Sequence, residues 1–157
     1  MGDTMELQTL TTARKPPSPH EESDSSSDDT DRPLVLKQVL ADLKAFTDEL
    51  GSSHIKVAET WNSLGLIRLY MQQNVHAAIK CHQEALSIYT GNQNSSSVDI
   101  AVTLNDLGRC YERLNDQKKA LETYERAHEM VLKDSSIRKT HSVVESVKRS
   151  MARLQRS

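Results

Sequence analysis

Three polar side chains recur at a four-residue spacing in the second half of the chain. Asn105, Arg109 and Arg113 stand at i, i+4 and i+8, which places them on one side of a helix. An Asn amide both donates and accepts hydrogen bonds, so it can hold a peptide backbone without reading its sequence. The two guanidinium groups suit a carboxylate. Asn62 supplies a second amide in a similar stretch of sequence. The asparagines are thus candidates for holding a peptide backbone, and the arginines favour an acidic ligand.

The same residues also fit a purely structural interpretation. Asparagines on helices are often simply solvated, and the two arginines have acidic neighbours at short spacing, Asp106 and Glu112. Ion pairs of this kind stabilise a helix without binding anything. The two interpretations differ in whether Arg109 and Arg113 are available to a ligand.

The sequence lacks the motifs of catalysis and metal binding. Its six histidines include no pair at i, i+4 and no His-Glu-x-x-His phrase, and no glycine-rich phosphate loop or Gly-x-Ser-x-Gly elbow occurs. Cys81 and Cys110 have no partner at zinc-site spacing, so we expect both to be small buried hydrophobes. We therefore expect no enzyme, no metal and no cofactor. Catalytic residues that meet only in three dimensions are the alternative.

Charge is distributed unevenly along the chain. The net charge is -2, but residues 1–33 carry eight acidic and three basic side chains, and the last 25 residues carry seven basic and two acidic ones. The small total argues against nucleic-acid binding as the main function. The basic end leaves a contact with nucleic acid or a membrane surface as an alternative. No signal peptide and no apolar run of roughly 20 residues is present, so we expect the cytosol or the nucleus.

Residues 1–32 are predicted to be a disordered acidic tail, because prolines and a run of Ser, Asp and Glu leave little apolar surface to offset the entropy of ordering. Ser25 and Ser26 have acids three residues later, and Ser18 precedes a proline. These are contexts in which protein kinases act. Each phosphate would add roughly -1.5 to -2 charges. A regulatory contact with the basic end of the chain is one hypothesis, and an inert tail is the other.

From residue 33 onward, apolar residues recur with the period of helices. The pattern predicts a leading helix over 33–50, a helix pair over 54–91, a second pair over 98–133 and a capping helix over 138–155. In the capping helix, valines and other apolar residues share one side, while basic residues occupy the other. Abundant Leu, Ala, Glu, Lys and Gln with few aromatic residues favour helices over a β-sandwich. The predicted fold class is all-α.

The two helix pairs repeat each other. Residues 77–86 align with 119–128 at a separation of 42, and Thr-Trp-Asn-Ser-Leu-Gly at 60–65 aligns with Thr-Leu-Asn-Asp-Leu-Gly at 103–108 at a separation of 43. The first unit therefore has one extra residue between Gly65 and Ala78. Small residues at fixed positions let the two helices of a pair approach closely. Such pairs stack on their neighbours to bury their apolar faces.

These residues resemble the tetratricopeptide repeat. In the second unit the signature positions hold Leu104, Leu107, Gly108, Tyr111, Ala120, Tyr124 and Ala127. In the first unit they hold Trp61, Leu64, Gly65, Ala78, Ala85 and Leu86, with Arg68 in place of the Tyr. A unit of 42 to 43 residues exceeds the usual length of about 34. It is similar to the repeats of kinesin light chains. Residues 54–65 resemble the phrase that opens the first helix of those repeats.

The resemblance covers residues 54–132 and implies a short solenoid of two full repeats plus flanking helices. It also implies a concave groove, lined by the first helix of each pair, in which Asn62, Asn105, Arg109 and Arg113 meet a peptide or a partner helix. We therefore expect a non-catalytic adaptor or complex subunit that binds a protein or peptide, in particular an acidic one. A short paralogue or fragment of a larger kinesin-light-chain-like cargo adaptor is an alternative. The partner and the oligomeric state stay open.

Overall fold

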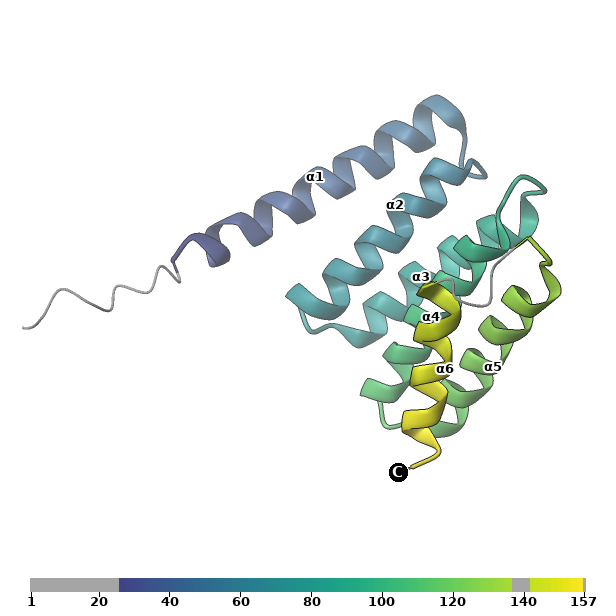
Figure 1. Ribbon diagram of the computed structural model, residues 1–157. Helices are drawn as coiled ribbons and strands as arrows, with labels where there is room; N and C mark the ends of the chain where they lie inside the picture. Colours follow the sequence, from purple (N-terminus) through teal and green to yellow (C-terminus); the bar gives the residue numbers. More distant parts are fainter. Residues whose placement is uncertain (1–25, 137–141, 157) are drawn as a thin grey trace, which may run out of the picture.

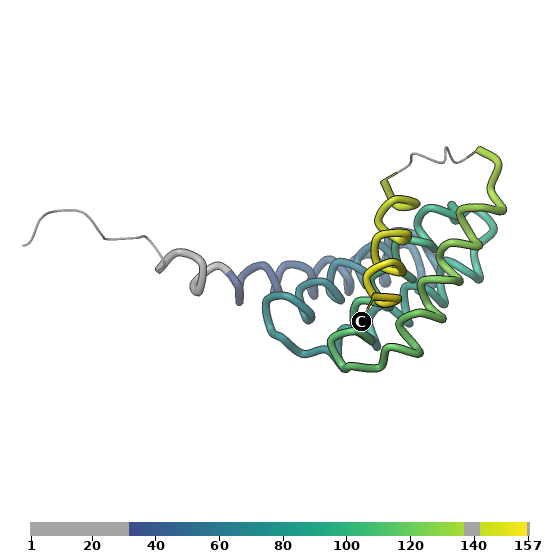
Figure 2. The backbone as a smooth tube through the Cα atoms, turned by 60° about the horizontal axis from the view of Figure 1, so that its bottom comes forward, coloured from purple at the N-terminus to yellow at the C-terminus, as the bar shows by residue number. Residues whose placement is uncertain are grey.

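The computed structural model describes residues 26–136 and 142–156, and this part of the chain consists of helices and connecting turns (Figure 1). In chain order the helices are α1 (Ser26–Leu50), α2 (Ile55–Leu66), the π-helix η1 (Ile67–Met71) that continues α2, α3 (Val75–Gly91), α4 (Ser97–Arg113), α5 (Gln117–Lys133) and α6 (Ser142–Leu154). Figure 2 shows them following one another from α1 at one end to α5 and α6 at the other. The prediction of an all-α solenoid of antiparallel helix pairs is confirmed.

Each of the four central helices begins at a side chain that caps it. Backbone N–H groups of the first turns donate at 3.0 to 3.2 Å to side-chain atoms just upstream, which are His54 Nδ1, Asn74 Oδ1, Ser96 Oγ and Asp116 Oδ1. These caps satisfy N–H groups that have no partner inside the helix. The turns within the two pairs also correspond, since Gln73 and Asn115 both have positive φ, 52° and 58°. Helix boundaries are thus set locally.

The second helices of the two pairs bury equivalent residues. The buried residues of α3 are Ala78, Cys81, His82, Ala85 and Tyr89, and those of α5 are Ala120, Thr123, Tyr124, Ala127 and Val131. Each residue of the second set follows its counterpart by 42 positions. The two pairs therefore pack in the same way, one after the other along the array.

The two helices of each pair approach most closely where a glycine faces a ring. Gly65 of α2 lies against the imidazole of His82, and Gly108 of α4 lies against the ring of Tyr124; both rings are fully buried. A Cβ atom on Gly65 would stand 2.6 Å from the His82 ring, and one on Gly108 would stand 2.5 Å from the Tyr124 ring. Both distances are far inside the normal contact distance. The helix approach itself therefore requires glycine at these two positions.

The extra residue of the first unit forms a π-helical turn. The N–H of Gln72 donates to the carbonyl of Ile67, five residues back, at 3.2 Å, and a hydrogen bond of this span defines a π-helix. The wider turn of η1 absorbs one residue without shifting the helix that follows. Leu69 consequently takes the place that Tyr111 has in the second unit, and it is fully buried. Arg68 is left half-exposed beside it.

α6 closes the array at its C-terminal end. Its residues Val143, Val144 and Val147 are buried in an apolar cluster with residues of α4 and α5. Each such valine contributes about 1.5 kcal/mol or more through burial. The apolar side predicted for the capping helix is therefore the side that packs. Its first helical residue among those described is Ser142, and the predicted start at 138 lies outside the described residues.

α1 begins at Ser26, seven residues before the predicted start at 33. Pro33 lies inside the helix, where its missing N–H removes one hydrogen bond. The structure thus differs from the predicted disordered tail over 26–32. A composition rich in Ser and Asp argues against a packed core but not against a helix end, where both residue types are favoured. The rest of the predicted tail, 1–25, lies outside the described residues.

Crossing a membrane requires a helix that is both long and apolar. None of the helices in the described part is both long enough and apolar enough to cross a bilayer. The longest, α1, has 25 residues but mixes charged with apolar side chains, and none of its residues from 32 onward is buried.

Substitution of Gly108 by Ala should destabilise the protein by about 1–3 kcal/mol, because the new methyl group must displace the buried Tyr124 ring. Gly65→Ala should behave alike against His82. A Cβ atom on Gly91 meets nothing within 4 Å, so Gly91→Ala is the matched control and should be neutral or slightly stabilising. Urea unfolding monitored by circular dichroism measures all three. Equal effects at positions 108 and 91 would contradict the packing argument.

Candidate binding site

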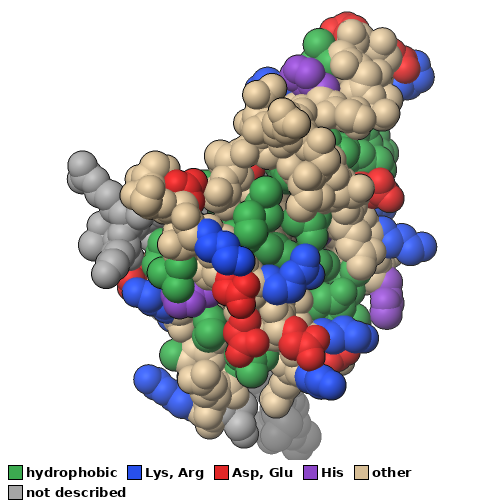
Figure 3. Space-filling view, turned by 90° about the vertical axis from the view of Figure 1, so that its right-hand side faces the viewer, with side chains coloured by type: hydrophobic (Ala, Val, Ile, Leu, Met, Phe, Trp, Pro, Cys, Tyr) green, Lys and Arg blue, Asp and Glu red, His purple; other side chains and the backbone are tan. Residues whose placement is uncertain are grey.

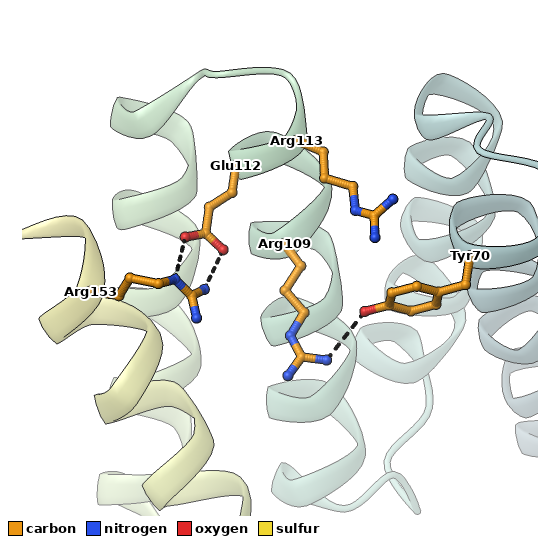
Figure 4. A pocket seen from close by; sticks show the side chains of 5 residues that line it. All are labelled: Tyr70, Arg109, Glu112, Arg113 and Arg153. Carbon is orange, nitrogen blue, oxygen red and sulfur yellow. Dashed lines mark hydrogen bonds and ion pairs between the residues drawn. The ribbon is translucent and has the colours of Figure 1, made fainter. Parts of the chain in front are cut away.

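Arginine side chains gather on the face formed by the first helices of the array. Over the face shown in Figure 3, acidic and basic side chains are interspersed. On the first-helix face, an open pocket of about 450 Å³ lies across η1, α4 and α6 (Figure 4). We call it the arginine pocket; its lining residues are Tyr70, Arg109, Glu112, Arg113 and Arg153. It contains both arginines predicted from the sequence.

Arg109 makes two long contacts in the pocket. Its Nη1 atom donates to the hydroxyl of Tyr70 at 3.5 Å and lies 3.7 Å from Asp106 Oδ1. Asp106 is almost fully buried, and this burial raises its pKa to about 6 while Arg109 opposes the rise. The Arg109 side chain is 41% exposed, and neither contact has the length of a strong charge-assisted hydrogen bond. Arg109 is therefore only partly neutralised.

Arg113 reaches over the repeat boundary. Its guanidinium carbon lies 5.0 Å from the centre of the Tyr70 ring, within the range of a cation–π contact. Its Nη1 atom donates to the carbonyl of Leu69 at 3.5 Å. Neither partner carries a negative charge, so Arg113 brings an uncompensated positive charge to the pocket. Tyr70 is 49% exposed and lies between the two arginines (Figure 4).

Glu112 is held by α6 and α5 instead of by its neighbouring arginines. Arg153 donates to its carboxylate through Nη2 at 2.6 Å and through Nε at 3.2 Å, and Tyr124 donates its hydroxyl at 2.8 Å. Burial and the nearby Glu112 carboxylate raise the pKa of Tyr124 above its ordinary range. The alternative expectation, that both arginines form ion pairs with acidic neighbours on α4, therefore holds only for Arg109, which pairs with Asp106. Glu112 pairs with neither Arg109 nor Arg113.

Asn62 joins the two repeats. Its Nδ2 group donates to Thr103 Oγ1 at 2.7 Å, and Thr103 in turn donates to the carbonyl of Asp99. Thr103 Oγ1 must therefore accept from the amide, so Asn62 Oδ1 accepts from His82 Nδ1 at 2.8 Å. Both ends of the amide are engaged. Its partners lie on α3 and α4, so the structure places the Asn62 amide at the junction of the two repeats, and its contact with a ligand stays a prediction.

Asn105, in contrast to Asn62, is buried. It is 5% exposed, and its Nδ2 group faces Ser146 Oγ of α6 at 3.4 Å. The prediction of a groove position left out α6, which covers this part of α4. Asn105 Oδ1 has no hydrogen-bond partner among the described residues. The amide therefore stands at the second junction of the array, as Asn62 does at the first.

Three residues of the arginine pocket were not predicted as site residues, namely Tyr70, Glu112 and Arg153. Glu112 was considered only as an ion-pair partner of the arginines. Tyr70 reaches the pocket through the π-turn of η1, which one sequence alone does not reveal. For Arg153 a signal exists. Thr60, Thr103 and Ser146 follow one another at 43 residues, and the contacts of Asn62 with Thr103 and of Asn105 with Ser146 both span 41. α6 thus packs against α4 in the way that α4 packs against α2, as the first helix of a third repeat would. The pair of Glu112 and Arg153 spans 41 residues as well.

The other predicted positions carry no site in the described part. Ser18 and Ser25 lie outside the described residues, and Ser26 is described only as the first residue of α1. Cys81 and Cys110 are buried and unbridged, as predicted, and burial raises the pKa of the Cys110 thiol to about 12. Within residues 26–136 and 142–156, no three His, Cys, Asp or Glu side chains gather as metal ligands would.

Residues 56–133 match the family model of the tetratricopeptide repeat. This segment is α2 to α5 with η1, the part in which the two helix pairs repeat their glycines, rings and caps. Residues 56–133 are therefore tetratricopeptide repeats, and such repeats generally mediate interactions between proteins. A comparison with curated proteins finds no match.

Acid should destabilise the protein through His82. Burial lowers the pKa of this imidazole from 6.5 to about 4, so the unfolded chain takes up the proton at a higher pH than the folded chain. The contribution to stability is complete above about pH 6.5 and is lost toward pH 4, by up to about 3 kcal/mol. Urea unfolding across this range measures it. His82→Phe should flatten that part of the profile, and the exposed-site control His76→Gln should not.

Asp106→Asn should stabilise the protein at pH 7. Because the folded-state pKa of Asp106 is raised to about 6, its contribution to stability is present below about pH 4 and is lost as the pH rises through 6. The amide removes this cost, up to about 3 kcal/mol at neutral pH, and changes little at pH 4. Thermal unfolding of both proteins at the two pH values provides the measurement. An equal difference at both would show that burial of the charge is not the cause.

Proposed function

We propose that the chain is a non-catalytic interaction module whose arginine pocket binds an acidic segment of a partner protein. The observation that carries the proposal is the charge of the pocket. Three guanidinium groups from α4 and α6 surround it, and the carboxylate of Glu112 is already paired with Arg153. An acidic ligand would supply the negative charge that Arg109 and Arg113 need for neutralisation.

The contacts of Arg109 and Arg113 are long enough for a ligand to replace them. Arg109 and Arg113 hold Tyr70, Leu69 and Asp106 at 3.5 to 3.7 Å. A carboxylate can approach a guanidinium to about 2.7–2.9 Å in a bidentate pair, which is considerably stronger. Tyr70, half-exposed between them, offers an aromatic surface for the stem of an acidic side chain. Arg153 and Glu112 form the fixed wall of the site.

The finer relationship is also part of the proposal. Buried positions that recur at 42 residues, together with the opening phrase at 54–65, support kinship with the long repeats of kinesin light chains. The role we infer is that of an adaptor or complex subunit. A short paralogue or a piece of a larger cargo adaptor with the same pocket is consistent with these features.

Reversal of the two arginine charges should abolish the interaction. The probe is a fluorescently labelled peptide of about ten residues rich in Asp and Glu, and its binding to the full chain is followed by anisotropy. Arg109→Glu with Arg113→Glu should weaken binding by at least about tenfold, because two attractions become repulsions. The matched control is Lys118→Glu with Arg126→Glu on the exposed side of α5. It makes the same change in net charge and should bind as the wild type does.

Two outcomes would count against the arginine pocket. Equal weakening in both double variants would mean that net charge, and not the pocket, attracts the peptide. Binding of a DNA duplex more tightly than of the peptide, with a steep loss of affinity at higher salt, would favour nucleic acid as the partner. Circular dichroism establishes that each variant is folded.

A further inference from the structure

α1 has the pattern of a second helix but lacks the corresponding burial. Counting 42 residues back from the buried positions of α3 gives Leu36, Val39, Leu40, Leu43 and Thr47. In α3 and α5 all five positions are buried, and in α1 none is. The contrast is sharpest at Leu40, which is 41% exposed, whereas its counterparts His82 and Tyr124 are fully buried. α1 thus has the apolar pattern of a second helix, but no first helix among the described residues covers it.

An apolar groove lies beside this incompletely covered helix. Leu40 of α1, Trp61 and Leu64 of α2 and Cys81 of α3 line it, and its volume is about 470 Å³. A smaller pocket of about 140 Å³ lies one repeat later, between α3 and α5 across α4, and two of its lining positions correspond to positions of the groove. Leu104 and Arg126 occupy there the positions that Trp61 and Glu84 have in the first groove. The larger groove has room for side chains that the chain itself does not supply.

The rim of the larger groove is mostly basic. Arg68 and Lys80 border it from α2 and α3, with Glu84 as the acidic residue. Lys37 and Lys44 stand three residues before and four after Leu40, so they flank it on the same side of α1. Lys44 pairs with Asp48 at 2.9 Å. Lys37 and Lys80 have no ion pair within the described part of the chain.

We propose that this groove binds an amphipathic helix of a partner protein, with aliphatic residues on one side and acidic residues flanking them. The aliphatic side chains would cover Leu40 and Trp61, and the flanking carboxylates would meet the basic rim. A helix is the natural occupant, because in the complete repeats the first helices α2 and α4 lie against His82 and Tyr124, the counterparts of Leu40. The site is independent of the arginine pocket.

Charge decides against a second copy of this chain as the occupant. In an antiparallel pairing of two α1 helices about Leu40, Lys37 of one copy would face Lys44 of the other. The two-fold symmetry of such a dimer would produce this repulsion twice. An acidic partner helix turns both repulsions into attractions.

The groove and the arginine pocket also lie on different sides of the first helix. Trp61, Leu64 and Arg68 share one side at i, i+3 and i+7, and Tyr70 projects toward α4 from the other.

The chain provides its own probe for the test. Trp61 is its only tryptophan, so intrinsic fluorescence reports the groove directly. The ligand is a synthetic amphipathic peptide of about 18 residues, five helical turns, made of Leu, Ala and Glu without aromatic residues. A second peptide replaces every Glu with Lys. The Glu peptide should shift the Trp61 emission to the blue in a saturable manner, and the Lys peptide should not.

Variants assign the response to the groove. Lys80→Glu should weaken binding of the Glu peptide by about three- to tenfold, because an attraction at the rim becomes a repulsion. Lys118→Glu on α5 makes the same charge change away from the groove and should have no effect. Leu40→Ala should weaken binding through the floor of the groove, and since Leu40 is half-exposed the variant should fold. Arg109→Glu with Arg113→Glu should leave the Trp61 response unchanged.

Several results would overturn this proposal without touching the arginine pocket. Equal binding of the Glu and Lys peptides would remove the role of the rim, and no saturable shift up to about 1 mM peptide would remove the site. A response lost in the Arg109 and Arg113 variant would place the peptide in the arginine pocket instead. Sedimentation that shows a dimer of the free chain, dissociated by Leu40→Ala, would assign the groove to a second copy.

Discussion

The contact between a helix glycine and a buried ring sets the geometry of both repeats. Gly65 receives the His82 imidazole and Gly108 receives the Tyr124 ring at distances that leave no space for a methyl group. Because the two helices of a pair touch at this point, the alanines on either side of it can be fully buried, and the pair presents a defined surface to the next one. The stacking of the array depends on this approach.

Polar groups then join one repeat to the next. At the first junction, His82, Asn62 and Thr103 form a chain of hydrogen bonds at 2.8 and 2.7 Å. At the second junction the corresponding Asn105 reaches Ser146 only at 3.4 Å, and the triad of Tyr124, Glu112 and Arg153 supplies the stronger link to α6. The same triad neutralises the one carboxylate of the arginine pocket. Attachment of the capping helix and the charge of the pocket are thus one arrangement.

The two surfaces that we propose for binding have different chemistry and share α2 with its continuation η1. The arginine pocket is open and charged, and Tyr70 contributes its ring to it. The groove beside α1 is apolar with a basic rim, and Trp61 and Leu64 form part of its floor. Both favour acidic partners, one through an extended segment and the other through a helix. A protein that offered both features could engage the chain from two sides.

The sequence alone determined the local and periodic properties of this protein. Helix type, the repeat of Gly65 at Gly108, the apolar side of α6 and the charged strip of Arg109 and Arg113 follow from residue spacing, because helical periodicity and close packing act over short distances. The engagement of Asn62 and Asn105 at the junctions, the π-turn that brings Tyr70 forward and the pairing of Glu112 with Arg153 were decided only by the tertiary structure. The contacts of Asn62 with Thr103, of Asn105 with Ser146, of Tyr70 with Arg109 and of Glu112 with Arg153 join residues about 40 positions apart. A single sequence does not reveal which side of a helix its neighbour will cover.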